Sequence, residues 1–344
     1  MSDRKKRDED NESITGSFWL PINKSQWWAL IKKAKLKDKT IQNFLPLRSG
    51  SKIGKRQFLL LRILYARCRL PSEFNIEKEQ YGLDGSWTEA EIRVNASTEF
   101  TNYLNLVGTA NQAESLSEED EGWPGAFFPT LQFQQKCLQP KANAVPLTPP
   151  TTRLSKRKRI AELFGTHAGH NQEHRAQPSA PDIAYEVDDE NIVNTGLILF
   201  LEAITSLIKP RKVEWTMKHV ALKAIFQSAC YEAQLDGALW TSLGRILRAL
   251  LEEAAEIVGW LKHSAGGMEK LLNGHRLLIS QDANQIFLSF ARADVEYYDY
   301  LENGNVAGEP FLSIQKWGPW LVNHKDHMKQ LATILAAIIL SLDE

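Results

Sequence analysis

The chain has 344 residues, of which 43% are hydrophobic and 24% charged, so it can bury the core of one or two domains and is not disordered throughout. Its three cysteines lie far apart, without CxxC or cysteine–histidine spacing, which argues against a disulfide framework or a structural zinc site and indicates a reducing compartment. The N-terminus lacks an apolar signal segment and the best apolar runs are short or interrupted. We therefore expect an intracellular protein without a membrane span.

The net charge of −1 conceals an uneven distribution of charge along the chain. Lysine and arginine outnumber aspartate and glutamate by 17 to 7 over residues 1–75, and this ratio reverses to 2 against 11 over residues 76–131. A basic segment can follow a phosphate backbone, because release of counterions drives such binding without sequence readout. Alternatively, the basic segment neutralises the acidic stretch that follows it, and the sequence alone does not separate the two.

Residues 1–16 are polar and charged and are expected to form a disordered tail. Residues 17–108 predict a small basic region that is mainly helical or irregular, with helices over 24–35 and 55–67. Basic residues lie among aromatic ones here, which would suit nucleic acid through stacking and charge. Such aromatics more often form the core of a small helical unit. The aromatic residues concerned are Trp27, Trp28, Phe58 and Tyr65.

Residues 109–185 are expected to form a low-complexity linker, because their acidic, proline-rich and polar segments cannot bury enough apolar surface to offset the entropy of ordering; local order is expected only around Trp123–Phe133. This linker contains a basic tetrad, Lys156–Arg159, of the kind found in nuclear import signals, and Arg4–Arg7 is a second. The three histidines at 167, 170 and 174 are expected to be solvated rather than metal-bound.

The last 160 or so residues show clearer periodicity. The predicted elements are a buried helix from 192 to 208, a short strand or helix within 213–226, a strand over 231–239, a continuous amphipathic helix over 242–262, a hairpin over 276–290, an edge strand over 311–314 and a final helix over 327–342. His324 and His327, at the start of the final helix, are expected to be exposed rather than ligands.

This order of elements resembles the αβββαβ core of the PD-(D/E)XK nuclease superfamily. Residues 186–344 are also similar to a family of fungal nuclease-like domains, through the segments DDENIVNTGLILFLEAIT, EWT, YEAQLDGAL, EEAAEIVGWL, RLLISQDANQIFLSFA and YYDYLENG. The resemblance implies an α/β (α+β) fold in which a small mixed sheet with a restriction-endonuclease-like core is flanked by helices. In that superfamily a carboxylate on one strand and an E-x-K triplet on the next hold one or two magnesium ions, and the lysine orients or activates the attacking water.

Asp236 matches the first carboxylate, so the resemblance implies that it is a catalytic residue and a magnesium ligand. An Asp-Gly pair is also what a turn at a strand end favours. No E-x-K triplet occurs in residues 183–344, which implies a core missing one strand and a phosphodiesterase that is inactive or impaired. Magnesium is expected only if the site still functions.

Glu252 and Glu253 are the nearest acidic residues downstream and would have to complete any surviving catalytic site. On a continuous helix they fall on the polar face, where glutamates are ordinarily exposed. If residues 246–251 formed a strand instead, Glu252 would be the second carboxylate and Ala254 would occupy the lysine position.

The sequence is compatible with two further hypotheses. The protein could be a non-enzymatic interaction module, in which the basic N-terminal segment and the linker bind nucleic acid or an acidic partner. An incorrect gene model would also account for a missing strand. Motifs for nucleotide hydrolysis, hydride transfer, serine hydrolysis and HExxH metalloproteases are absent from the sequence.

Overall fold

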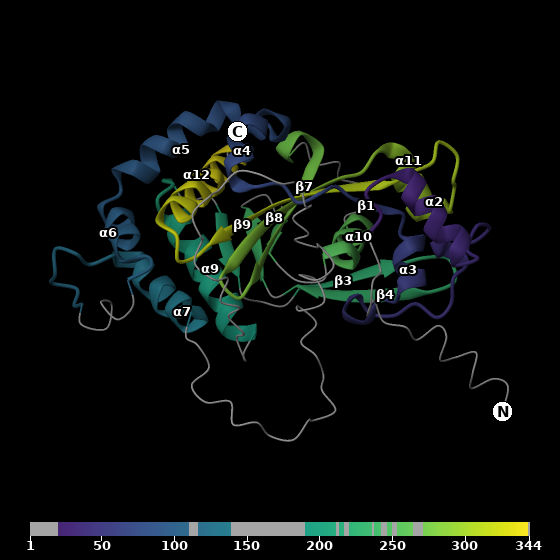
Figure 1. Ribbon diagram of the computed structural model, residues 1–344, viewed down its shortest axis with the longest axis horizontal. Coiled ribbons are helices and arrows are strands. Elements are labelled where there is room, and N and C mark those ends of the chain that lie inside the picture. The colour runs from purple at the N-terminus through teal and green to yellow at the C-terminus, as the bar shows by residue number, and fades with distance from the viewer. Residues whose placement is uncertain are drawn as a thin grey trace, which may run out of the picture.

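The computed structural model describes residues 20–109, 116–138, 190–210, 213–216, 220–235, 237–241, 246–249, 253–263 and 271–342. These residues form a mixed α+β fold, so the expected fold class is confirmed (Figure 1). Within them, seven strands make one sheet in the order β1-β9-β8-β7-β6-β5-β2, and β3 and β4 form a separate pair. None of the described helices is long and apolar enough to cross a membrane.

The helices and strands follow one another along the chain in two groups. The first group contains α2 (Lys24–Lys33), α3 (Lys55–Leu60), β1 (Ile63–Tyr65), α4 (Pro71–Glu77), α5 (Asp84–Ala96), α6 (Thr98–Leu106) and α7 (Phe128–Leu138). The second contains α9 (Glu190–Ser206), β2 (Val213–Thr216), β3 (Val220–Ile225), β4 (Cys230–Leu235), β5 (Gly237–Thr241), β6 (Ile246–Ala249), α10 (Glu253–His263), β7 (His275–Asp282), β8 (Gln285–Arg292), α11 (Val295–Asn303), β9 (Leu312–Leu321) and α12 (Lys325–Ser341).

The large sheet lies between two hydrophobic cores. The α12-side core contains Leu277, Phe290 and Trp317 from the sheet and receives α4, α5, α6, α9 and α12. The α10-side core contains Leu278 and Ile314 from the opposite face of the same strands and receives α2, α3, α10, α11 and the β3–β4 pair. Successive side chains on a strand point to opposite faces, which is why neighbours such as Leu277 and Leu278 belong to different cores.

The N-terminal region is built into both cores. Strand β1 pairs in parallel with β9, with Ile63 opposite Leu312, and α5 packs along α12 (Figure 1). Trp27, Phe58 and Tyr65 are buried, so these three form core as the helical interpretation expects, whereas Trp28 is 36% exposed. The division of the chain into domains remains a prediction.

Several sequence-based expectations are confirmed and several are wrong. The first N-terminal helix, the 276–290 hairpin and the final helix are present as α2, β7–β8 and α12. The helix expected over 55–67 ends at Leu60 and is followed by β1, and the strand expected at the sheet edge, β9, is an interior strand between β1 and β8. The order expected around Trp123–Phe133 is present as α7, which packs on α9. The predicted tail, both basic tetrads and the three linker histidines lie outside the described residues.

The main correction concerns residues 231–262. The expected strand over 231–239 is two strands in different sheets, β4 and β5, and the expected continuous helix is β6 followed by α10. Residues 246–249, which we expected to lie in a helix, therefore form a strand. The apolar residues of this segment continue the helical spacing of the segment that follows it. Strand β6 is nevertheless short and pairs with both β5 and β7, so it is an interior strand of the sheet.

Candidate functional site

In the sequence, the three residues predicted for the catalytic site are next to β5, after β6 and at the start of α10. Asp236 and Glu252 are outside the described residues. Glu253 is the first residue of α10, and the structure does not describe its side chain. What the structure does provide is the backbone arrangement around these positions.

The pairing of β5, β6 and β7 brings the start of β5 and the end of β6 next to each other. Strand β5 is antiparallel to β6, and its first residue, Gly237, pairs with the last residue of β6, Ala249. Strand β6 is parallel to β7, with Ala249 opposite Ile279, and α10 connects the two. Positions directly before β5 and directly after β6 therefore adjoin the same pair of strand ends.

The described part of this arrangement contains no lysine at the position that an E-x-K triplet would require. Strand β6 reads Ile-Leu-Arg-Ala. Ala254, which would occupy the lysine position if Glu252 were the second carboxylate, is 8% exposed in the α10-side core, and Ala255 is fully buried beside it. A methyl group in that core cannot orient or activate water.

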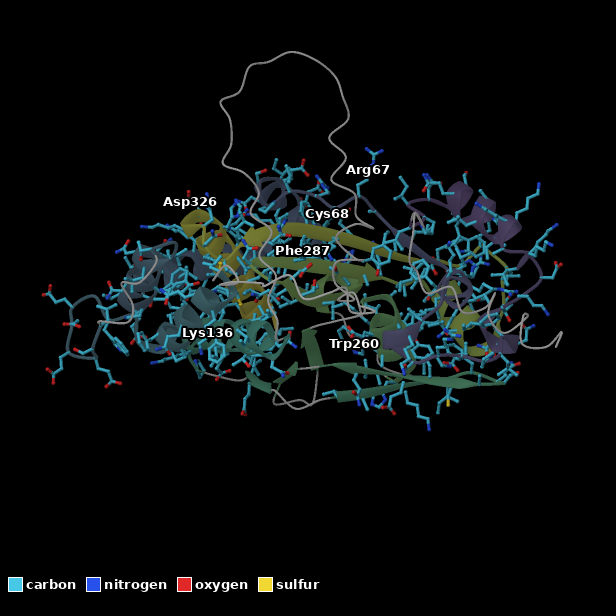
Figure 2. All side chains as sticks on the ribbon, turned by 60° about the horizontal axis from the view of Figure 1, so that its bottom comes forward. Arg67, Cys68, Lys136, Trp260, Phe287 and Asp326 are labelled. Carbon is cyan, nitrogen blue, oxygen red and sulfur yellow. The ribbon has the colours of Figure 1, made fainter. Side chains whose placement is uncertain are left out.

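A second group of polar side chains lies on the α10-side face of β7, β8 and β9. Ser289 and Lys316 face each other across β8 and β9, and Ser280 and Phe287 face each other across β7 and β8. The polar members are largely shielded from solvent; Ser289 is 0%, Lys316 3% and Ser280 9% exposed. We call Ser280, Ser289, Lys316 and Phe287 the β8 polar cluster, and Figure 2 labels Phe287 on the central strands.

Lys316 is the unusual member of the β8 polar cluster, because lysine is rarely fully buried unless it is paired. Its Nζ lies 4.4 Å from the centre of the Phe287 ring, a cation–π contact that offsets part of the cost of burial. The Ser289 hydroxyl, in contrast, has no hydrogen-bond partner among the described residues. A buried orphan hydroxyl marks either an ordered water or a binding position.

Arg276 lies on the same face, on the other side of Leu278 from Ser280. Its guanidinium lies 4.6 Å from the centre of the Trp260 ring on α10, and its Nη2 donates a 3.5 Å hydrogen bond to the Tyr298 hydroxyl on α11. Figure 2 labels Trp260 on this side of the sheet. These contacts fix α10 and α11 against the strands, so Arg276 has a structural role.

The polar cluster was not anticipated from the sequence, although a signal for it exists. Leu312, Ile314 and Lys316 are every second residue of β9, so their side chains point to the same face of the sheet. Leu312 and Ile314 are buried on that face, so the lysine is expected to be buried there too. Recognising β9 as an interior strand would have predicted a buried lysine.

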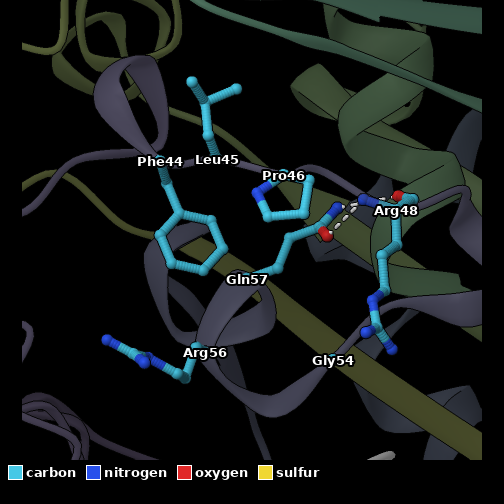
Figure 3. A pocket seen from close by; sticks show the side chains of 7 residues that line it. All are labelled: Phe44, Leu45, Pro46, Arg48, Gly54, Arg56 and Gln57. Carbon is cyan, nitrogen blue, oxygen red and sulfur yellow. Dashed lines mark hydrogen bonds between the residues drawn. The ribbon is translucent and has the colours of Figure 1, made fainter. Parts of the chain in front are cut away.

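A surface hollow lies between the chain that follows α2 and the start of α3. Figure 3 shows Gln57 at its base, where the side chain accepts a 2.8 Å hydrogen bond from the Arg48 backbone N and donates a 3.0 Å bond to the Arg48 carbonyl. The hollow has a volume of about 30 Å³, which suits a water molecule and not a substrate. Its lining residues are Phe44, Leu45, Pro46, Arg48, Gly54, Arg56 and Gln57.

His324 caps the start of α12, and His327 binds the end of β9. The Nδ1 atom of His324 accepts a hydrogen bond from the His327 backbone N, and the Nδ1 atom of His327 accepts one from the Leu321 backbone N. His324 is exposed as expected, whereas His327 is half-buried, and this burial lowers its pKa. Among the described residues, no group of three or more histidine, cysteine, aspartate or glutamate side chains could hold a metal ion.

Comparison of the chain with protein-family models, with curated proteins and with solved structures gives no match. The arrangement of β5, β6, α10 and β7 is therefore the main basis for a functional proposal.

Proposed function

We propose that this chain is a nuclease-like protein with a restriction-endonuclease-like core, in which metal-dependent hydrolysis of phosphodiesters has been lost or strongly impaired. The observation that carries the proposal is the order α9, β2, β5, β6, α10, β7, in which the three strands pair antiparallel and the last strand joins in parallel across a helix. The β3–β4 pair is then an insertion between the first two strands.

The positions of the carboxylates in the sequence support the proposal that the chain descends from a metal-dependent nuclease. In the sequence, Asp236 directly precedes Gly237, and Glu252 and Glu253 come three and four residues after Ala249; Gly237 and Ala249 pair with each other. Carboxylate oxygens are the ligands that Mg²⁺ prefers, and a bound Mg²⁺ would lower the pKa of an attacking water and neutralise charge on the phosphate.

The absence of a lysine at the E-x-K position supports the proposal that hydrolysis is lost or impaired. Lys316 cannot replace it, because β9 is separated from β6 by β7 and β8, a distance of about 14 Å at the usual strand spacing. A general base must come within hydrogen-bonding reach of the water whose proton it removes. The alanine at the lysine position, Ala254, is buried in a core and has no group that could meet that requirement.

Cleavage of supercoiled plasmid and of single-stranded DNA by the full chain, with Mg²⁺ or Mn²⁺ against a chelator control, tests the proposal. We expect cleavage at or barely above the chelator control, and we expect Asp236→Ala to abolish any that remains. The double variant Leu250→Glu with Glu252→Lys creates an E-x-K triplet directly after β6 and should raise metal-dependent cleavage. Leu250→Glu alone is the matched control and should not.

Two results would contradict the proposal. Strong cleavage by the unmodified chain would show that hydrolysis is intact, and cleavage unaffected by Asp236→Ala would remove this aspartate from the site. Thermal unfolding of each variant shows whether a change in cleavage reflects chemistry or loss of fold.

A further inference from the structure

The end of α2 carries a dense run of lysines that nothing in the described structure neutralises. Five of the eight residues from 32 to 39 are lysine and one is Asp38; all five lysines are exposed, and none has an ion pair or hydrogen bond to a described side chain. We call them the α2 lysine run; its members are Lys32, Lys33, Lys35, Lys37 and Lys39.

The backbone that carries the α2 lysine run is firmly anchored. Helix α2 ends in a Schellman motif, in which the Lys35 N donates to the Lys32 carbonyl at 3.2 Å and the Leu36 N donates to the Ile31 carbonyl at 3.0 Å. Leu36 and Ile31 are each 1% exposed, so the apolar contact of the motif is buried in the α10-side core. The lysines therefore project from a fixed turn.

Lys35 occupies the position in this motif where glycine is the usual residue. Its φ is +56°, in the left-handed region that a residue with a Cβ enters only at a cost in stability. Its side chain is exposed and contributes no packing in return. A lysine here makes the fold slightly less stable, which is expected if the charge itself is useful.

Helix stabilisation and charge neutralisation within the chain account for only part of the run. Lysines near a helix C-terminus interact favourably with the helix dipole, but this effect is confined to the last turn and covers Lys32 and Lys33 alone. Neutralisation by the acidic residues 118–121 does not apply, because the segment before α7 lies at the opposite end of the long axis of the molecule from α2 (Figure 1).

The chemistry of the surface favours one class of partner. A membrane-surface helix needs an apolar face to insert between lipids, but Trp27 and Ile31 of α2 are buried in the protein, which leaves Trp28, 36% exposed, as its exposed large apolar side chain. A protein interface needs an apolar centre, which the run lacks. We propose that the α2 lysine run binds the phosphate backbone of nucleic acid without reading its sequence. This proposal does not depend on the nuclease-like assignment.

Fluorescence anisotropy with labelled single- and double-stranded oligonucleotides, measured in a chelator over a range of salt concentrations, tests the proposal. The affinity should fall linearly with salt on logarithmic axes. The triple variant Lys33→Ser, Lys37→Ser and Lys39→Ser should lower affinity about tenfold or more and reduce the slope by about 3 on duplex DNA. The control variant Lys209→Ser, Lys223→Ser and Lys329→Ser removes the same charge from exposed lysines elsewhere. It should change affinity less than twofold, because it alters only the net charge of the protein.

Lys35→Gly provides a test in which affinity and stability move in opposite directions. The melting temperature should rise by about 2 °C, because the left-handed conformation becomes unstrained, while affinity for the oligonucleotide falls. Loss of affinity in this variant therefore cannot be caused by unfolding.

Three results would overturn the proposal. These are equal losses of affinity in the two triple variants, unchanged affinity in both the lysine-run triple variant and Lys35→Gly, and binding to anionic lipid vesicles or to polyglutamate that is at least as tight as oligonucleotide binding and is lost in the same variants. Because no metal is present, failure here would leave the cleavage experiment unaffected.

Discussion

The two faces of the central sheet differ in what they bury. On the α12 side, aromatic rings pack directly on one another; the rings of Tyr81 and Phe290 are stacked at 3.8 Å, and the Trp317 ring lies 5.1 Å from Phe74. On the α10 side, the same strands carry the β8 polar cluster, with a lysine that is 3% exposed. Both faces bury apolar residues, but the α10-side face also contains polar groups that cost free energy to bury.

The polar residues on the α10 side are not those that stability alone favours. A sheet selected only for stability would place apolar residues at Ser289 and Lys316, as it does at Leu288 and Trp317 next to them in sequence. Buried polar groups are retained when they serve a specific structure or a site. Removing the unpartnered polar group on the α10 side should therefore change stability with the opposite sign to removing an aromatic ring on the α12 side.

The largest effect is expected on the α12 side. Trp317→Ala removes a fully buried ring and leaves the Tyr81 hydroxyl, which now accepts a 2.8 Å hydrogen bond from Trp317 Nε1, without that partner. We expect a loss of about 3–5 kcal/mol in the free energy of unfolding, measured by chemical denaturation. Phe287→Ala, on the opposite face and only partly buried, is the matched control and should cost clearly less; equal costs would show that the two faces are equivalent.

A smaller effect of opposite sign is expected on the α10 side. Ser289→Ala removes the buried hydroxyl that has no partner among the described residues, so the free energy of unfolding should rise by about 1 kcal/mol. Thr205→Ala is the control, because the Thr205 hydroxyl is also buried but accepts a 2.9 Å bond from Trp215 Nε1. Destabilisation by both substitutions to a similar extent would mean that Ser289 is hydrogen-bonded.

The smallest effect is a dependence of stability on pH that comes from the α12 side. Burial lowers the pKa of His275 below its ordinary value of 6.5, and its ring packs edge-on against Tyr81. The unfolded chain therefore binds more protons below pH 6.5, so stability is lost as pH falls from there towards the lower pKa of the folded state. The melting temperature should drop between pH 7 and 5.5, and the drop should be smaller in His275→Phe. An identical drop in that variant would assign the effect to other groups, including His327, whose pKa burial also lowers.

Prediction from the sequence succeeded where local signals were sufficient. The final helix has a strong 3.6-residue pattern, and the β7–β8 hairpin is formed by neighbouring segments. It failed where the outcome depends on a distant partner. Strand β9 is interior only because β1, from more than 240 residues earlier, pairs with it, and β6 is a strand only because β5 and β7 lie on either side.

The candidate site divides in the same way. The aspartate before β5 was identified from its Asp-Gly pair and from a family resemblance, and its role in a site remains a prediction because Asp236 lies outside the described residues. The β8 polar cluster was missed because Ser280, Ser289 and Lys316 come from three strands, and no local spacing links them. Lys35 was noted only as part of a basic segment, since its left-handed backbone is not visible in a charge count.

The pairing of β1 with β9 has a practical consequence for anyone who divides this protein. A fragment beginning near residue 186 would lack β1 and α5, so one side of β9 would lose its backbone hydrogen bonds and α12 would lose its cover. Unprotected strands of that kind recruit other chains edge to edge. Poor yield or precipitation of such a fragment would then reflect where it was cut, and would say nothing about how well the intact protein folds.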